Sequence, residues 1–303
     1  RGFLKPALSR QNLRLVTGAL IDRLLIEDGR CTGVAWIENG VERTARAGGE
    51  VVVSTGAVAT PALLERSGLG DAARVGALGV APRVHLPGVG ANLQDHLEFY
   101  FQMACTKPVT LYGQANLIGK ALVGAQWLFL RGGPAATNHF EAGGFVRSND
   151  DVAYPNLMYH FLPIAVRYDG TSPASGHGYQ VHVGPMYSDA RGHVKIRTAD
   201  PAAKPSILFN YLSTEQDRRE WVEAIRVTRD ILGQPALMEY SGGELSPGAE
   251  VETDEQILDW VRKDSETALH PSCTARMAPM AVRSDMANTA VMPRRRPSSA
   301  CMA

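Results

Sequence analysis

The segment VVVSTGAVATPALLERSGLG, residues 51–70, decides how the chain is expected to fold. Val51, Val52 and Val53 form a fully apolar run, which is typical of a strand buried on both faces of a helix-covered parallel sheet. After a turn of small residues, Thr60 can cap a helix, Pro61 fits its first turn and Gly68 lies where it ends. The segment therefore predicts the strand, turn and helix unit of an α/β domain.

Short strands are predicted before this unit, over residues 12–18, 19–28, 31–40 and 41–56, with Gly, Asn or Asp at the breaks. From about residue 99 to residue 211 the chain alternates apolar and polar residues between Gly, Pro, Ser and Asp, which indicates an antiparallel sheet. Helical patterns return over residues 213–233 and 253–263. The first helix is expected to bury one face, comprising Trp221, Val222, Ile225, Thr228 and Leu232.

The fold class predicted from these patterns is α/β in its first part and α+β overall, in two spatial domains. Residues 1–98 and 214–277 are expected to form part of a Rossmann-like nucleotide-binding domain, and residues 99–213 an antiparallel substrate domain. Residues 278–303 mix small residues, prolines and three consecutive arginines without periodicity. They are expected to form an irregular tail.

Composition narrows the functional classes. Thirty-one basic and thirty-one acidic residues cancel, so no excess charge indicates nucleic acid or an anionic membrane as a partner. The four cysteines are scattered, which argues against a disulfide framework and a zinc site and favours a reducing compartment. The apolar run Ala121–Leu130 is too short to cross a bilayer and predicts a buried helix. No signal peptide is visible, and the start at Arg1 suggests a piece of a longer protein.

Most common catalytic motifs are missing. The nearest match to the dinucleotide motif Gly-x-Gly-x-x-Gly is GVGANL, residues 88–93, whose last position is Leu93. No Walker loop, His-Glu-x-x-His or Gly-x-Ser-x-Gly is present. His177, His182 and His193 have no metal-ligand spacing, so they are interpreted as surface or packed residues and no metal is predicted.

The stretch TALHPSCTARM, residues 267–277, sets His270 just after the second predicted helix. A histidine there can transfer a proton near neutral pH. It can equally be a packed or solvated residue of a turn, and the residues alone favour that reading.

Several segments resemble the glucose-methanol-choline (GMC) flavin oxidoreductases. GAVATPALLERSGLG, residues 56–70, matches the family signature, LPGVGANLQDHLE, residues 86–98, resembles the loop that follows, and HPSCTARM, from residue 270, resembles the catalytic-histidine segment. RGFLKPA, TNHFEAGGFVRS and HPSCT most resemble the bacterial choline-oxidising members. The family's glycine motif has no counterpart here. Ala275 and Ala278 interrupt the family pattern, and only Met292-Pro293 matches the segment near a second catalytic residue.

The resemblance implies an FAD-dependent alcohol oxidoreductase, in which the flavin takes a hydride and the protein manages the hydroxyl proton. It implies His270 as the catalytic group, and Glu98 and His160 as choline-binding residues. Implied contacts to FAD are Gly56, Ala57, Thr60, Asn92, Asp95 and His96. Without the resemblance, Glu98 is consistent with a charged residue at a strand edge and His160 with a core residue. Gly88 and Gly90 are then consistent with an ordinary tight turn.

Alternatives remain at this point. One is a GMC dehydrogenase for another primary alcohol, and another is an inactive truncated product or interaction module. The chain alone is expected to bind FAD weakly or not at all, because it lacks the glycine motif that holds the pyrophosphate. The electron acceptor is not predicted, and the expected location is the cytoplasm, with peripheral association at the inner membrane left open.

Overall fold

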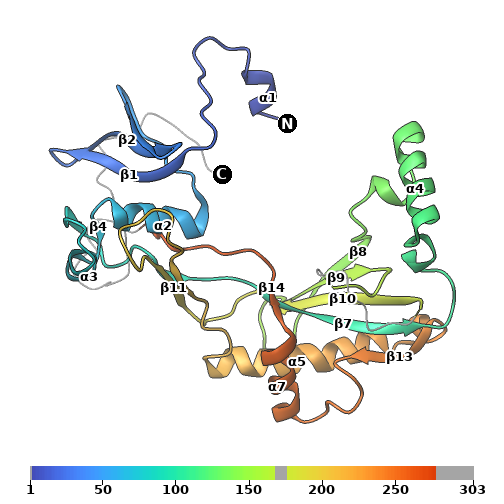
Figure 1. Cartoon of the computed structure of the whole chain (residues 1–303). Helices are drawn as coiled ribbons and strands as arrows, with labels where there is room; N and C mark the ends of the chain where they lie inside the picture. Colours follow the sequence, from blue (N-terminus) through green and yellow to red (C-terminus); the bar gives the residue numbers. More distant parts are fainter. Residues whose placement is uncertain (1, 168–175, 278–303) are drawn as a thin grey trace. The chain divides into compact units, whose positions relative to one another are not determined.

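The computed structural model describes residues 2–167 and 176–277, which form two compact units (Figure 1). The first unit comprises the residues up to Gln94, Arg191–Phe209 and those from Pro271. The second comprises Asp95–Ala190 and Asn210–His270. These units differ from the predicted domains in two respects. Residues 191–209, predicted within the substrate domain, lie in the first unit. The helical region after residue 213 joins the antiparallel sheet, because its apolar face packs there.

The first unit contains a three-stranded antiparallel sheet of β1 (Leu20–Glu27), β2 (Arg30–Glu38) and β3 (Val41–Arg46). Its two connections, Asp28-Gly29 and Asn39-Gly40, have positive φ at both residues. This is the geometry that two-residue hairpins prefer, which explains the Asp-Gly and Asn-Gly pairs. Helix α2 (Gly56–Arg66) packs on β1 through its buried residues.

The remaining elements of this unit are short. A second sheet has the order β12 (Ser206–Leu208), β11 (Gly192–Lys195), β6 (Ala91–Leu93). β4 (Leu69–Gly70) pairs in parallel with β5 (Val84–His85), and the helices α1 (Leu4–Ala7) and α3 (Ala72–Ala77) complete the unit.

Two predictions about residues 51–70 are wrong in detail. Residues 51–53 are not in a strand, and Val52 is 80% exposed, since no strand of residues 2–167 or 176–277 pairs with it. Helix α2 begins at Gly56, so Pro61 lies inside it. Proline has no N–H to donate to the carbonyl of Ala57, and that oxygen accepts the Thr274 hydroxyl instead. The strand predicted over residues 12–18 does not form either.

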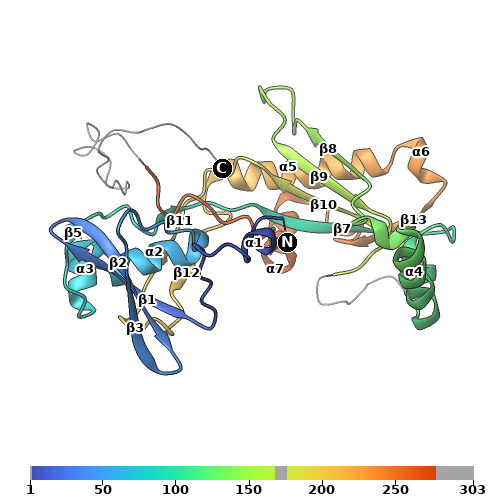
Figure 2. The same ribbon diagram turned by 90° about the horizontal axis from the view of Figure 1, so that it is seen from above.

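The second unit is built on a six-stranded antiparallel sheet, as the alternation predicts (Figures 1 and 2). The strand order is β13 (Ser241–Ser246), β7 (Leu97–Cys105), β10 (Gly178–Pro185), β9 (Leu157–Leu162), β8 (Ala142–Val146), and β14 (Glu266–Thr267) also pairs with β7. Mixed helix and antiparallel sheet is therefore the confirmed fold class.

One face of this sheet packs on α5 (Glu215–Leu232), which runs along it in Figure 1. Helix α7 (Asp254–Asp264) packs beside α5 and adds its buried residues to the same core. Phe99, Phe101 and Val181 alternate onto this face and meet Trp221 and Ile225 of α5. All five residues predicted for the buried face of α5 are buried, and Gly233 caps its end. The prediction of this helix is confirmed. Its apolar residues recur at helical spacing, so they form one stripe that packs against the face of the sheet.

Helix α7, predicted over residues 253–263, begins with a capping box. The Thr253 hydroxyl accepts the Gln256 N–H, and the Gln256 side chain accepts the Thr253 N–H. Replacing Thr253 with alanine should lower the free energy of unfolding by about 1 kcal/mol, because one N-terminal donor loses its acceptor. Urea denaturation would measure this, with the exposed neighbour Glu252→Ala as the control. Equal stability of the two variants would contradict the assigned cap.

Helix α4 (Leu117–Leu130) corrects another prediction. The apolar run does form a helix, but none of its residues is buried. Leu117, Phe129 and Leu130 are each at least 75% exposed. The shorter helical segments η1 (Leu111–Gln114), η2 (Pro134–Ala136) and α6 (Pro235–Met238) complete this unit. Within the described residues, no helix has the length and apolar character needed to cross a membrane.

Candidate active site

The second face of the six-stranded sheet carries polar side chains on three neighbouring strands. Because side chains alternate along a strand, β7 presents Glu98 and Gln102 here, β10 presents Gln180 and His182, and β9 presents His160. Cross-strand pairing sets Gln180 opposite Gln102 and His182 opposite His160. The predicted substrate residues Glu98 and His160 therefore lie on one face.

Glu98 is 7% exposed and pairs with His182, whose Nδ1 lies 3.3 Å from Glu98 Oε1. Burying a carboxylate is costly unless it is hydrogen-bonded or paired. A structural role for His182 in holding this carboxylate follows from the contact.

Aromatic rings lie beside these groups. The centroid of the Tyr100 ring lies 4.2 Å from that of the His182 ring. The centroid of the Phe140 ring lies 5.7 Å from that of His160 and 5.4 Å from that of His182. Of the three rings that follow Glu98 in the sequence, Tyr100 shares its face. Phe99 and Phe101 point into the core, as alternation requires.

His270 is positioned through its backbone by Asp95. One Asp95 oxygen, Oδ1, accepts the His270 N–H at 2.9 Å, and the other accepts the hydroxyls of Tyr211 and Thr267. Leu269 has φ +62°, a strained conformation for a branched residue, and its N–H donates to Thr267 Oγ1 at 3.0 Å. Asp95 therefore fixes the chain reversal that presents His270.

The His270 ring contacts a second histidine. Its Nδ1 lies 3.3 Å from Nδ1 of His96, and His96 Nε2 lies 3.1 Å from the carbonyl oxygen of Met186. A carbonyl oxygen only accepts, so His96 Nε2 donates the proton and Nδ1 of the neutral ring accepts. His270 then carries its proton on Nδ1. Its Nε2 keeps a lone pair, which is the form needed to accept a proton.

His160 links the two groups of residues electrostatically. Burial lowers the pKa of its imidazole and Glu98 opposes the shift, while His182 and His270 lower the pKa further when they carry a proton. Ring and carboxylate charges from positions 98, 160, 182 and 270 are thus close enough to influence one protonation equilibrium.

The other predicted flavin contacts lie in the first unit. Gly56 has φ +80° and open space beside its Cα, and Thr60 Oγ1 lies 2.9 Å from Thr55 Oγ1. Asn92 has φ +61°. A side chain at Gly90 would meet the Val194 carbonyl oxygen at 2.0 Å, so close packing against β11 requires that glycine.

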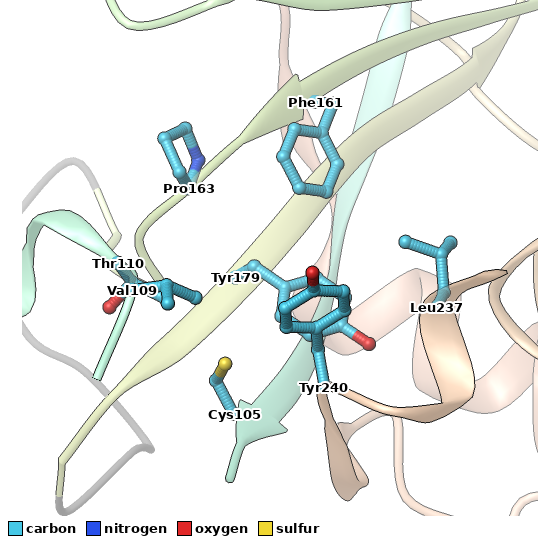
Figure 3. Close-up of a pocket in the computed structure, with 8 residues that line it drawn as sticks. All are labelled: Cys105, Val109, Thr110, Phe161, Pro163, Tyr179, Leu237 and Tyr240. Carbon is cyan, nitrogen blue, oxygen red and sulfur yellow. The ribbon is translucent and has the colours of Figure 1, made fainter. Parts of the chain in front are cut away.

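An apolar cavity of about 230 Å³ lies on the opposite sheet face, lined by Cys105, Phe161, Tyr179, Leu237 and Tyr240 among others (Figure 3). Its residues Phe161 and Tyr179 alternate with His160 and Gln180, which belong to the polar face. None of the predicted site residues lines it. No group of three or more His, Cys, Asp or Glu side chains that could hold a metal occurs in residues 2–167 and 176–277.

Comparison with known proteins fits this geometry. Residues 1–98 match the N-terminal part and residues 188–289 the C-terminal part of the family described as GMC oxidoreductase. The chain belongs to the GMC oxidoreductase family. The predicted resemblance is thereby confirmed.

One relative in sequence is the oxygen-dependent choline dehydrogenase of Staphylococcus saprophyticus. It is 58% identical to this chain, over 92% of this chain and 50% of the relative. Pyridoxine 4-oxidase from Mesorbium loti is 26% identical with a TM-score of 0.76, over 91% of this chain and 50% of the other. Formate oxidase from Aspergillus oryzae, whose structure concerns FAD modification, is 23% identical with a TM-score of 0.82, over 89% and 52%. The chain spans about half the length of these proteins.

The sequence did not indicate His182, Gln102 or Gln180 as residues of this candidate site. His182 was interpreted as a surface or packed histidine, and Gln102 and Gln180 were not singled out. The one available signal was GYQVHVG, residues 178–184, where Gln180 and His182 share a face by alternation. Nothing local to that stretch indicates that it pairs with the strand carrying Glu98. No second catalytic residue was predicted, and Met292-Pro293, which matches the family segment near that residue, lies outside the described residues.

Proposed function

We propose that this chain carries the substrate-binding and proton-abstracting part of an FAD-dependent choline dehydrogenase, which oxidises choline to betaine aldehyde. One observation carries the proposal: a buried carboxylate and three imidazoles, at positions 98, 160, 182 and 270, are coupled within a single unit. The names of the staphylococcal relatives support choline as the alcohol.

The chemistry of choline fits the polar face. Its quaternary ammonium has no N–H to donate, so only charge and aromatic faces recognise it. Glu98 supplies the charge, and Tyr100 and Phe140 supply rings that flank His182. At an effective permittivity of about 20, two unit charges about 4 Å apart attract by roughly 4 kcal/mol, enough to select a cation over a neutral alcohol.

The hydroxyl end requires a proton acceptor. His270 Nε2 has the free lone pair, and His96 and Asp95 fix the ring and the backbone that present it. His160, kept neutral by its lowered pKa, is suited to hydrogen-bond the alcohol oxygen. The alcohol is thus held and deprotonated by side chains of one unit.

The first unit fits a flavin. Its α2 begins at the exposed Gly56, and its N-cap residue Thr55 makes no side-chain cap, so the first N–H groups of the helix are available to a polar group. We assign Gly56, Ala57, Thr60 and Asn92 to holding FAD. When bound, FAD accepts the hydride from the alcohol carbon. Asp95 and His96, also predicted as flavin contacts, act in this proposal chiefly on His270.

Exchanging Glu98 for glutamine tests the substrate assignment. The variant should raise KM for choline about tenfold or more and leave KM for 3,3-dimethylbutan-1-ol, in which carbon replaces nitrogen, within about twofold. The exposed Glu239→Gln is the matched control, expected to change neither. Two results would indicate that another primary alcohol is the substrate. One is a wild-type kcat/KM for aliphatic or aryl alcohols equal to that for choline, and the other is an equal rise of KM for choline and for 3,3-dimethylbutan-1-ol in Glu98→Gln.

The cytoplasmic location and the peripheral association at the inner membrane remain predictions. The exposed apolar helix α4, which contains Lys120 and is followed by Arg131 at its C-cap, is the element we would assign to membrane contact. The electron acceptor is not assigned.

A further inference from the structure

Three buried side chains lead to Glu98 by a one-way series of hydrogen bonds. Gln102 Nε2 donates to Gln180 Oε1 at 2.7 Å, the Gln180 amide lies 2.8 Å from His182 Nε2, and His182 Nδ1 lies 3.3 Å from Glu98 Oε1. Gln102, Gln180 and His182 are each at most 4% exposed. The direction of each bond is therefore set by the protein rather than by solvent.

The orientation of the Gln180 amide is fixed by a backbone group. Its Oε1 also accepts the N–H of Val166 at 2.9 Å, and a backbone N–H can only donate. The atom facing His182 is consequently the Gln180 NH2 group, which has no lone pair to offer. His182 Nε2 must then accept, so a proton on that nitrogen is excluded by the neighbouring donor.

The protonation state of His182 follows. With Nε2 accepting, the ring is neutral and carries its proton on Nδ1, from which it donates to Glu98. The titratable groups beside this ring include Glu98 and Tyr100 of β7 and His160 of β9, and the Phe140 ring also contacts it. Glu98 alone would favour an imidazolium, whose charge would cancel its own. The amide of Gln180 opposes this.

We infer that Gln180 is a positioning residue for substrate specificity, which holds His182 neutral so that the Glu98 carboxylate keeps its charge for a cationic alcohol. The inference rests on the proposed function. It extends that function, because Gln180 acts through His182 on Glu98 and so contributes to the preference for a cationic alcohol. Gln102 and Val166 serve to hold the amide.

Nitrogen NMR of histidine-labelled full chain tests the first step directly. In wild type, His182 should show one protonated nitrogen, Nδ1, and one unprotonated nitrogen, Nε2, at pH 7. A doubly protonated His182, or a proton on Nε2, would overturn the inference whatever any variant does.

The variant Gln180→Met tests the second step, because methionine keeps the length of the side chain and removes the opposing donor. His182 should become doubly protonated at pH 7, and affinity for choline should fall about tenfold while affinity for 3,3-dimethylbutan-1-ol changes less than twofold. Tyr159→Phe removes a buried hydrogen bond from the opposite sheet face and should change neither readout.

The outcomes separate this inference from the proposed function. Wild type that does not prefer choline to its neutral analogue would remove the proposed function itself. Wild type that prefers choline, together with a Gln180→Met protein whose His182 stays neutral or whose preference is unchanged, would remove only the role of Gln180.

Discussion

Flavin reduction by choline should slow about 10²- to 10⁴-fold when His270 is replaced by glutamine, the range expected for loss of a general base. Glutamine can hydrogen-bond to His96, but its side chain has no basic nitrogen to take the place of His270 Nε2. Stopped-flow measurement of the FAD-loaded enzyme under anaerobic conditions would give the rate without interference from the electron acceptor.

Two variants place this result in context. His96→Gln should cost less than His270→Gln, because it disturbs the tautomer of His270 and leaves the base itself in place. His177→Gln is the matched control, since His177 hydrogen-bonds to Thr110 and takes no part in the proposed site. A rate within about threefold of wild type for His270→Gln would assign proton removal to another group.

The contrast between helices and strands shows what local sequence can predict. Helices α5 and α7 are predicted correctly because the capping residues and the apolar periodicity of each helix lie within one short, contiguous segment of sequence. Residues 51–53 are apolar enough for a buried strand, but a strand also needs partners, and none of the described strands pairs with them. The apolar sequence of α4 likewise predicts burial, although its surroundings leave it exposed.

The same limit applies to the site. His270 and Glu98 were predicted because each lies in a contiguous motif that resembles the family. His182 was interpreted as a surface or packed residue because its spacing fits no metal site. Its partner Glu98 is about 80 residues away in the chain, and only the register that sets His182 opposite Tyr100 and His160 brings the two together. Asp95 was predicted as a flavin contact from its loop. Its hydrogen bonds to Tyr211, Thr267 and His270 depend on segments that no local pattern joins.

Replacing Asp95 with alanine should destabilise the second unit by about 3–5 kcal/mol, because three donors lose one charged acceptor at about 1–1.5 kcal/mol or more each. Burial and the hydrogen bond to Asp95 raise the pKa of Tyr211 well above its usual range, so its hydroxyl stays a donor throughout the working pH range. Urea denaturation would measure the loss. Asp259→Ala, which removes an exposed carboxylate on α7, should change stability by less than about 0.5 kcal/mol. The free energy of unfolding of Asp95→Asn, which retains an acceptor for the His270 N–H, should lie between those of Asp95→Ala and Asp259→Ala. If Asp95→Ala is as stable as Asp259→Ala, the chain reversal that presents His270 is held by other contacts.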